Sequence, residues 1–190
     1  MPVPDSSLIG KVAQKLTQAP AYAAAEGARG SLLSVAASSY GFKSDNDDLT
    51  QPTGFDPEAA RLFEAVVEGA FLVANADGDF DDTERAAFQH VVVAACAGRV
   101  GERQVAALLA DLHDQLDEDG LDKRIEMVAR AIAREDHARE VLRVSSLLAQ
   151  VSGGVSSVER AVLDKLAAEF KLTALAVEQA IQEAAHALDD

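Results

Sequence analysis

Residues 75–84 carry the side chains of this sequence that are best suited to chemistry. The stretch reads NADGDFDDTE and lies between the apolar runs FLVA and AAFQHVVVAACA. Ca²⁺ and Mg²⁺ prefer oxygen ligands, and an EF-hand loop supplies them at fixed positions around a central glycine. With Gly78 at position six of such a loop, position one falls on Val73, whose side chain has no oxygen, so the full signature is absent. The stretch predicts at most a weak divalent-cation site, with these candidate ligands: Asn75, Asp77, Asp79, Asp81 and Glu84.

The same acids also suit the beginning of a helix. Asp81 and Glu84 have the spacing of a capping box, in which each side chain accepts a hydrogen bond from the backbone N–H of the other residue. Negative charge near a helix N-terminus stabilises the helix by about 0.3–1 kcal/mol per group. Two interpretations therefore stay open, a capped turn without a specific metal and a divalent-cation site for which Ca²⁺ or Mg²⁺ is the most plausible ion.

An internal repeat shows which residues the turn needs in order to fold and which it does not need. The segment LVANADGDFDDTERAAF, which begins at Leu72, is followed 75 residues later by LLAQVSGGVSSVERAVL, which begins at Leu147. Both copies keep a glycine, an apolar residue two positions later and a Glu-Arg pair, whereas serine and glycine replace the aspartates of the first copy in the second. The shared features predict a positive-φ glycine turn, an apolar anchor and a helix cap. The surplus carboxylates are thus the best candidates for function, and Glu159 is the second-half counterpart of Glu84.

The residues after position 55 show the periodicity of helices. Asp56 and Pro57 suit an N-cap and a first helical position, and the apolar residues that follow recur at intervals of three and four. One segment carries Asp111, Asp114 and Asp117 on the side opposite its leucines. We predict an all-α protein, a compact bundle of about seven helices in two pseudo-symmetric halves, within a domain formed by residues 55–190.

Residues 1–54 differ in character and are predicted to form a partly helical N-terminal arm and linker. The segment SSLIGKVAQKL places its apolar residues on one helical face, and KSDNDDLTQPTGFDP has the composition of a polar linker. The apolar face of this first helix is small, so we expect it to pack on the chain itself or on a partner rather than on a membrane.

Charge and cysteine content narrow the function classes. The chain has 32 acidic and 17 basic residues and a formal net charge of −15. Such a surface repels phosphate backbones, so nucleic acid is not an expected partner, whereas cations and basic protein surfaces are. The single cysteine, Cys96, is expected to be buried and unreactive, which fits a reducing compartment. We find no secretion signal and no apolar run long enough to be a transmembrane segment, and we expect a cytoplasmic protein.

No arrangement of residues points to catalysis. The four histidines share no metal-ligand spacing with one another, and the sequence contains no phosphate-binding glycine loop and no nucleophile motif. We therefore identify no catalytic residues and predict that the chain is not an enzyme.

The acidic turn resembles an element of the TerB family of tellurite-resistance proteins. The element Ala74-x-Ala76-Asp77-Gly78-x-Phe80-x-x-x-Glu84 fits fully, and a second, weaker one lies at LLAQVSGGVSSVE; the likeness covers roughly residues 57–172. The resemblance implies an all-helical domain of two similar halves, a role in tellurite or metal stress, and a place in a membrane-associated stress complex. It also implies that Asp77 and Glu84, with Asp81 beside them, are cation ligands. In the second element Ser152 replaces the aspartate, so only Glu159 remains there.

Two hypotheses follow for the function. The first is a TerB-like acidic module of the stress response that binds a divalent cation at the turn from Asp77 to Glu84. The second is a helical protein-interaction module that docks to a basic partner, or to the cytoplasmic face of a membrane protein, without a specific metal.

Overall fold

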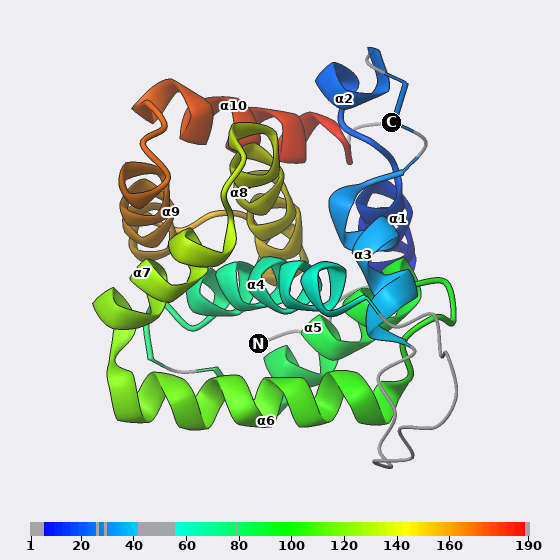
Figure 1. Ribbon diagram of the computed structural model, residues 1–190, viewed down its shortest axis with the longest axis horizontal. Coiled ribbons are helices and arrows are strands. Elements are labelled where there is room, and N and C mark those ends of the chain that lie inside the picture. Colours follow the sequence, from blue (N-terminus) through cyan, green and yellow to red (C-terminus); the bar gives the residue numbers. More distant parts are fainter. Residues whose placement is uncertain (1–5, 26, 29, 42–55, 79, 189–190) are drawn as a thin grey trace.

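The computed structural model describes residues 6–25, 27–28, 30–41, 56–78 and 80–188, and within them every regular element is a helix (Figure 1). This confirms the predicted all-α bundle. The helices run in the following order: α1 (Ser6–Thr17), α2 (Ala21–Ala25), α3 (Leu32–Tyr40), α4 (Pro57–Ala74), α5 (Asp82–Ala95), α6 (Glu102–Asp119), α7 (Leu121–Ala131), α8 (Glu135–Ala149), the 3₁₀-helix η1 (Gln150–Ser152), α9 (Ser157–Glu169) and α10 (Ala174–His186). The seven α-helices from α4 onward agree with the number predicted for this region. No helix among the described residues is both long enough and apolar enough to cross a membrane.

Helix α4 crosses the centre of the molecule and packs against α8, α7 and α3 (Figure 1). It begins as predicted, since the Asp56 carboxylate accepts a hydrogen bond from the Glu58 N–H at 3.0 Å and Pro57 follows at the first helical position. Its last three turns are buried on almost every side, which is typical of a helix at the centre of a core. Gly69 allows the closest approach to α8, because a Cβ at this position would lie 2.6 Å from Cγ1 of Val141.

The first helices belong to the same hydrophobic core. Val12 and Leu16 of α1 are fully buried, and α1 packs against α5. Tyr40 of α3 stacks on Phe63 of α4, with ring centroids 4.6 Å apart. The apolar face of α1 is therefore covered by the protein itself. Of the linker predicted at residues 43–57, residues 43–55 lie outside the described part of the chain, so the division into an arm and a domain stays a prediction.

The repeat found in the sequence recurs in the element boundaries. Helices α4 and α8 end at Ala74 and Ala149, and α5 and α9 begin at Asp82 and Ser157, so both pairs keep the offset of 75 residues. The glycines of the two turns have the predicted left-handed backbone, with φ of +78° at Gly78 and +108° at Gly153. This confirms the repeat at the helix–turn–helix level.

An ion pair inside the bundle connects three helices. The Nε and Nη2 atoms of Arg124 on α7 lie 2.7 and 2.6 Å from Oε1 of Glu68 on α4. Its Nη1 donates to Oδ2 of Asp119, at the end of α6, at 2.9 Å. The side chains of Arg124 and Glu68 are both only 10% exposed, so this contact replaces hydration that the two charges lose on folding.

Candidate functional site

The acidic turn places two of the predicted ligands in a helix cap. Oδ1 of Asp81 accepts a hydrogen bond from the Glu84 N–H at 2.8 Å, and Oε2 of Glu84 accepts one from the Asp81 N–H at 3.3 Å. This reciprocal pair is the capping box that the spacing predicts, and it begins α5. One oxygen of each carboxylate is therefore directed at the backbone.

The second copy builds the same cap with one carboxylate fewer. Oγ of Ser156 accepts from the Glu159 N–H at 3.3 Å, and Oε2 of Glu159 accepts from the Ser156 N–H at 2.7 Å. Glu159 is 9% exposed. Its hydrogen bond from the Ser156 N–H, at the beginning of α9, accounts for this position. The equivalence of Glu84 and Glu159 that the repeat predicts is confirmed as an equivalence of capping roles.

An aromatic cluster anchors the acidic turn to the core. The ring of Phe80 meets Phe71 of α4 edge to face at a centroid distance of 5.5 Å, and Phe88 of α5 at 5.9 Å. The guanidinium of Arg85 lies 6.0 Å from the centroid of the Phe80 ring. Phe80 is thus the apolar anchor that the repeat predicts, and its contacts fix the turn between α4 and α5.

The remaining predicted ligands do not join the cap. Asn75 is the C-cap of α4, where its N–H donates to the carbonyl of Phe71, and Asp77 is exposed. Asp79 lies outside the described residues. In the part of the chain that the structure describes, no three His, Cys, Asp or Glu side chains are grouped so that they could hold one metal ion. The cation site at this turn stays a prediction.

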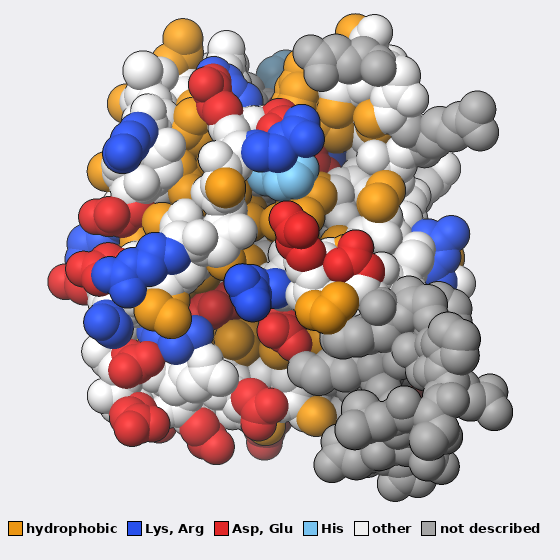
Figure 2. Space-filling model, in the orientation of Figure 1, with side chains coloured by type: hydrophobic (Ala, Val, Ile, Leu, Met, Phe, Trp, Pro, Cys, Tyr) orange, Lys and Arg blue, Asp and Glu red, His pale blue; other side chains and the backbone are white. Residues whose placement is uncertain are grey.

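A second acidic surface lies along α6, and we call it the α6 acidic face: Asp111, Asp114, Asp117 and Glu118. All four side chains are exposed, while the opposite side of the helix is buried in the core through Val105, Leu108, Leu109 and Leu112. Figure 2 shows acidic side chains gathered along the lower edge of the molecule, where α6 runs in Figure 1. Asp117 lies 3.8 Å from His113, whereas the other three form no ion pair within the described structure.

No family model matches the chain. No curated protein and no solved structure matches it either. The resemblance to the TerB family therefore stays a prediction that rests on the motif at residues 74–84.

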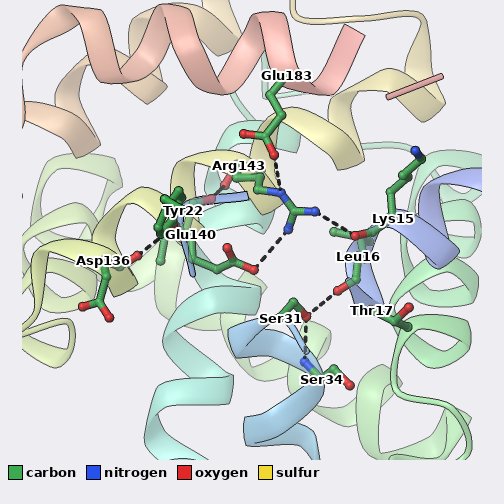
Figure 3. Close-up of polar contacts among 12 residues, drawn as sticks. Lys15, Leu16, Thr17, Tyr22, Ser31, Ser34, Asp136, Glu140, Arg143 and Glu183 are labelled. Carbon is green, nitrogen blue, oxygen red and sulfur yellow. Dashed lines mark hydrogen bonds and ion pairs between the residues drawn. The ribbon is translucent and has the colours of Figure 1, made fainter. Parts of the chain in front are cut away.

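A third candidate site was not predicted from the sequence. Arg143 of α8 is 5% exposed, and its guanidinium joins three helices (Figure 3). Its Nη1 donates to Oε1 of Glu140 on α8 at 3.1 Å, its Nε to Oε1 of Glu183 on α10 at 3.0 Å, and its Nη2 to the carbonyl of Lys15 on α1 at 2.8 Å. The sequence carries one weak signal for it, because Glu140 and Arg143 stand directly before Val141 and Val144, which belong to the predicted apolar stripe of this helix.

The Arg143 cluster lies beside an open groove between α2, α8 and α10. The groove has a volume of about 580 Å³ and is lined by Tyr22, Glu135, Asp136, Arg139, Arg143, Ala176, Gln179, Ala180 and Glu183. A smaller hollow of about 160 Å³ adjoins it, since Tyr22 and Asp136 line both, and Glu140 lines the smaller one. The hydroxyl of Tyr22 donates to the carbonyl of Asp136 at 3.3 Å, which links α2 to the beginning of α8.

The buried groups of this cluster have altered proton affinities. Burial raises the pKa of Glu140, although Arg143 and the nearby Leu32 amide act to lower it. Burial also raises the pKa of the Tyr22 phenol, and the negative charge of Glu140 adds to this effect. The cluster therefore holds a buried carboxylate, Glu140, whose charge is stabilised by Arg143 and by the Leu32 amide.

Proposed function

We propose that this chain is a non-enzymatic acidic helical module that docks through the α6 acidic face onto a basic surface of a protein partner. The observation that supports this most is the row of exposed carboxylates on α6, of which Asp111, Asp114 and Glu118 form no ion pair in the described structure. The opposite side of the helix is buried in the core. The folded chain presents these charges to solvent at fixed positions. A partner with matching lysines or arginines would meet them without rearranging the helix.

The α6 acidic face is unfavourable for the helix that carries it. Asp111 and Asp114, Asp114 and Asp117, and Asp114 and Glu118 are neighbours three or four residues apart, and each such like-charged pair destabilises a helix by about 0.2–0.5 kcal/mol. Asp117 and Glu118 also lie in the last turn, where the helix dipole disfavours negative charge. Folding does not require these acids, and binding of a basic surface would relieve their repulsion.

The docking function can be tested with an oligolysine peptide as the probe. We expect Asp111→Asn/Asp114→Asn to weaken binding in fluorescence anisotropy by about 2- to 30-fold, because exposed ion pairs contribute about 0.2–1 kcal/mol each. The control is Glu58→Gln/Glu169→Gln, which changes the net charge equally at exposed acids of α4 and α9. Wild-type affinity should fall as salt rises. Equal losses in the two double variants, or an affinity indifferent to salt, would contradict docking at α6.

A cation-binding, TerB-like role in metal or tellurite stress is the second candidate. It is supported by the surplus carboxylates of the first turn, since the second copy forms its cap without them. Calorimetric titration with Ca²⁺ and Mg²⁺ should give heat that Asp77→Asn reduces and Asp164→Asn, an exposed control on α9, does not. Asp77 is the better target than Glu84, because Glu84 is part of the cap. Absence of cation-dependent heat in the wild type would refute this role.

A further inference from the structure

The groove between α2, α8 and α10 has the dimensions of a small-molecule site. Its volume of about 580 Å³ lies within the range of about 300–1,000 Å³ typical of ligand pockets. It is formed by other helices than α6 and does not include the turn at residues 75–84. Its ligand would therefore be independent of the docking function proposed above.

The basic side chains of the groove are already occupied by carboxylates. Three nitrogens of Arg143 donate to Glu140, Glu183 and a main-chain carbonyl. Arg139 donates through Nε and Nη2 to Oε1 of Glu135, at 3.1 and 2.9 Å. An anionic ligand would have to displace one of these carboxylates, so the groove is a poor site for an anion.

Beside the groove lies the buried carboxylate of Glu140. Glu140 is 2% exposed and uses Oε1 to accept from Arg143. Its Oε2 has no hydrogen bond of normal geometry in the described structure, although the Leu32 amide lies near enough to the carboxylate to lower its pKa. Glu140 lines the smaller hollow, which shares Tyr22 with the groove. Figure 3 shows Glu140 and Tyr22 next to each other on the same side of Arg143. Glu140 thus adds a buried negative charge on the Tyr22 side of the groove, and this charge attracts a cation bound there.

The other walls suit a cation that carries an apolar body. Tyr22, which is 39% exposed, offers an aromatic ring, and such rings attract ammonium groups to their faces. Ala176 and Ala180 line the opposite side and leave room for methylene groups. Glu183 is bonded to Arg143 through Oε1, and its side chain is 45% exposed. Glu135 and Asp136 also line the groove but are bonded to Arg139 and Arg134, so Glu183, on the same helix as the two alanines, is the lining carboxylate beside an apolar wall.

We infer that this groove binds a small alkylammonium ligand, whose ammonium group is held by Glu183 and the Tyr22 ring, and whose carbon chain lies on Ala176 and Ala180. The net charge of −15 raises the local concentration of such cations around the protein. The site takes free small amines, since its volume matches a compact ligand rather than an extended chain.

The inference can be tested with three five-carbon probes whose head groups are positive, neutral and negative: pentylammonium, pentan-1-ol and pentanoate. In ¹⁵N–¹H NMR titrations of the full chain, pentylammonium should bind saturably, with shifts concentrated in α2, α8 and α10. The two other probes should give no saturable shifts at the same concentrations. Equal binding of pentan-1-ol would show that the groove binds the apolar carbon chain without regard to charge. Preferred binding of pentanoate would show that the groove is an anion site. Either result overturns the proposal.

Matched variants on α10 locate the site without disturbing the core. Gln179→Lys places a competing ammonium in the groove, and Gln182→Lys makes the same change at an exposed position that does not line it. We expect the first to weaken pentylammonium binding about tenfold and the second to change it less than about twofold. Glu183→Gln and Glu178→Gln form a second pair, because each glutamate bonds to an arginine through Oε1 and their side chains are 45% and 43% exposed.

Only the change at Glu183 should weaken pentylammonium binding in that second pair. Circular dichroism melting curves establish that each variant is folded before its affinity is compared. An equal loss of affinity in both members of a pair, or no saturable binding of pentylammonium to the wild type, refutes the inference.

Discussion

Replacement of Arg124 by methionine tests how the buried ion pair contributes to stability. Arg124 holds the Glu68 carboxylate at 2.6–2.7 Å, with both side chains about nine-tenths buried. Methionine keeps an unbranched apolar stem of similar length but removes the charge and all hydrogen-bond donors. The carboxylate of Glu68 then stays in the core without a counter-charge, while Asp119, at the end of α6, can turn to solvent.

The expected loss is large for a single substitution. Removing one partner of a buried ion pair typically costs about 3–5 kcal/mol, because the remaining charge is neither hydrated nor compensated. For a chain of this length, each kcal/mol lowers the melting temperature by roughly 2–4 °C. We therefore expect Arg124→Met to melt about 6–20 °C below the wild type at pH 8.

The loss should depend on pH in a defined direction. Burial raises the pKa of Glu68 above its usual value, although Arg124 acts to lower it. A carboxyl group with a raised pKa binds its proton more tightly in the folded state, so the free energy of unfolding falls as pH rises through that range. Without Arg124 the pKa rises further and the range extends upward. The deficit of Arg124→Met should thus be smaller at pH 5 than at pH 8.

Urea denaturation followed by circular dichroism at pH 5 and pH 8 measures these quantities. The double variant Glu68→Leu/Arg124→Met is the control, because an apolar pair leaves no uncompensated charge and is often as stable as the ion pair. The double variant should recover most of the stability that Arg124→Met loses. Its free energy of unfolding should no longer show the pH dependence that Glu68 causes. The reasoning is refuted if Arg124→Met lies within about 1 kcal/mol of the wild type at pH 8, or if the double variant is no more stable than the single one.

Three further predictions concern other contacts. Gly69→Ala should destabilise the fold by about 1–3 kcal/mol in urea denaturation, because the new Cβ would lie 2.6 Å from Cγ1 of Val141. Gly10→Ala should instead stabilise α1 by up to about 1 kcal/mol, because no atom lies within 4 Å of the new Cβ. Ser156→Ala should lower the free energy of unfolding by about 1 kcal/mol through loss of the α9 cap, with a fall of about 2–4 °C in melting temperature. Burial raises the pKa of the Cys96 thiol to about 12, so a thiol reagent at pH 8 should modify it only after urea unfolds the chain.

The features that could be predicted from the sequence are those that depend on neighbouring residues. The two capping boxes need only a side-chain oxygen and a glutamate three residues later, and both form as predicted at Asp81 and Ser156. The left-handed turns at Gly78 and Gly153 follow from a backbone conformation that glycine adopts without strain. The beginning of α4 follows in the same way from Asp56.

The groove could not be predicted, because its residues come from distant parts of the chain. Tyr22, Arg143 and Glu183 are separated by more than 100 and by 40 residues, and only the packing of α2, α8 and α10 brings them together. On its own, Glu140 would be expected at the surface, since glutamate is rarely buried without a partner. Glu140 is buried because α8 packs against α1, α4, α9 and α10.

By itself, the sequence determined where α4, α5 and α9 begin and where the glycine turns before α5 and α9 lie. Helix caps and glycine turns depend on only a few neighbouring residues, which is why they could be predicted. Only the tertiary structure decided which charged residues are buried. Glu68 with Arg124 and Glu140 with Arg143 became buried pairs, whereas Asp111 and Asp114 stayed exposed, although all six are ordinary helical residues. The physical reason is that the desolvation of a side chain depends on which helices surround it, and these helices come from distant parts of the sequence.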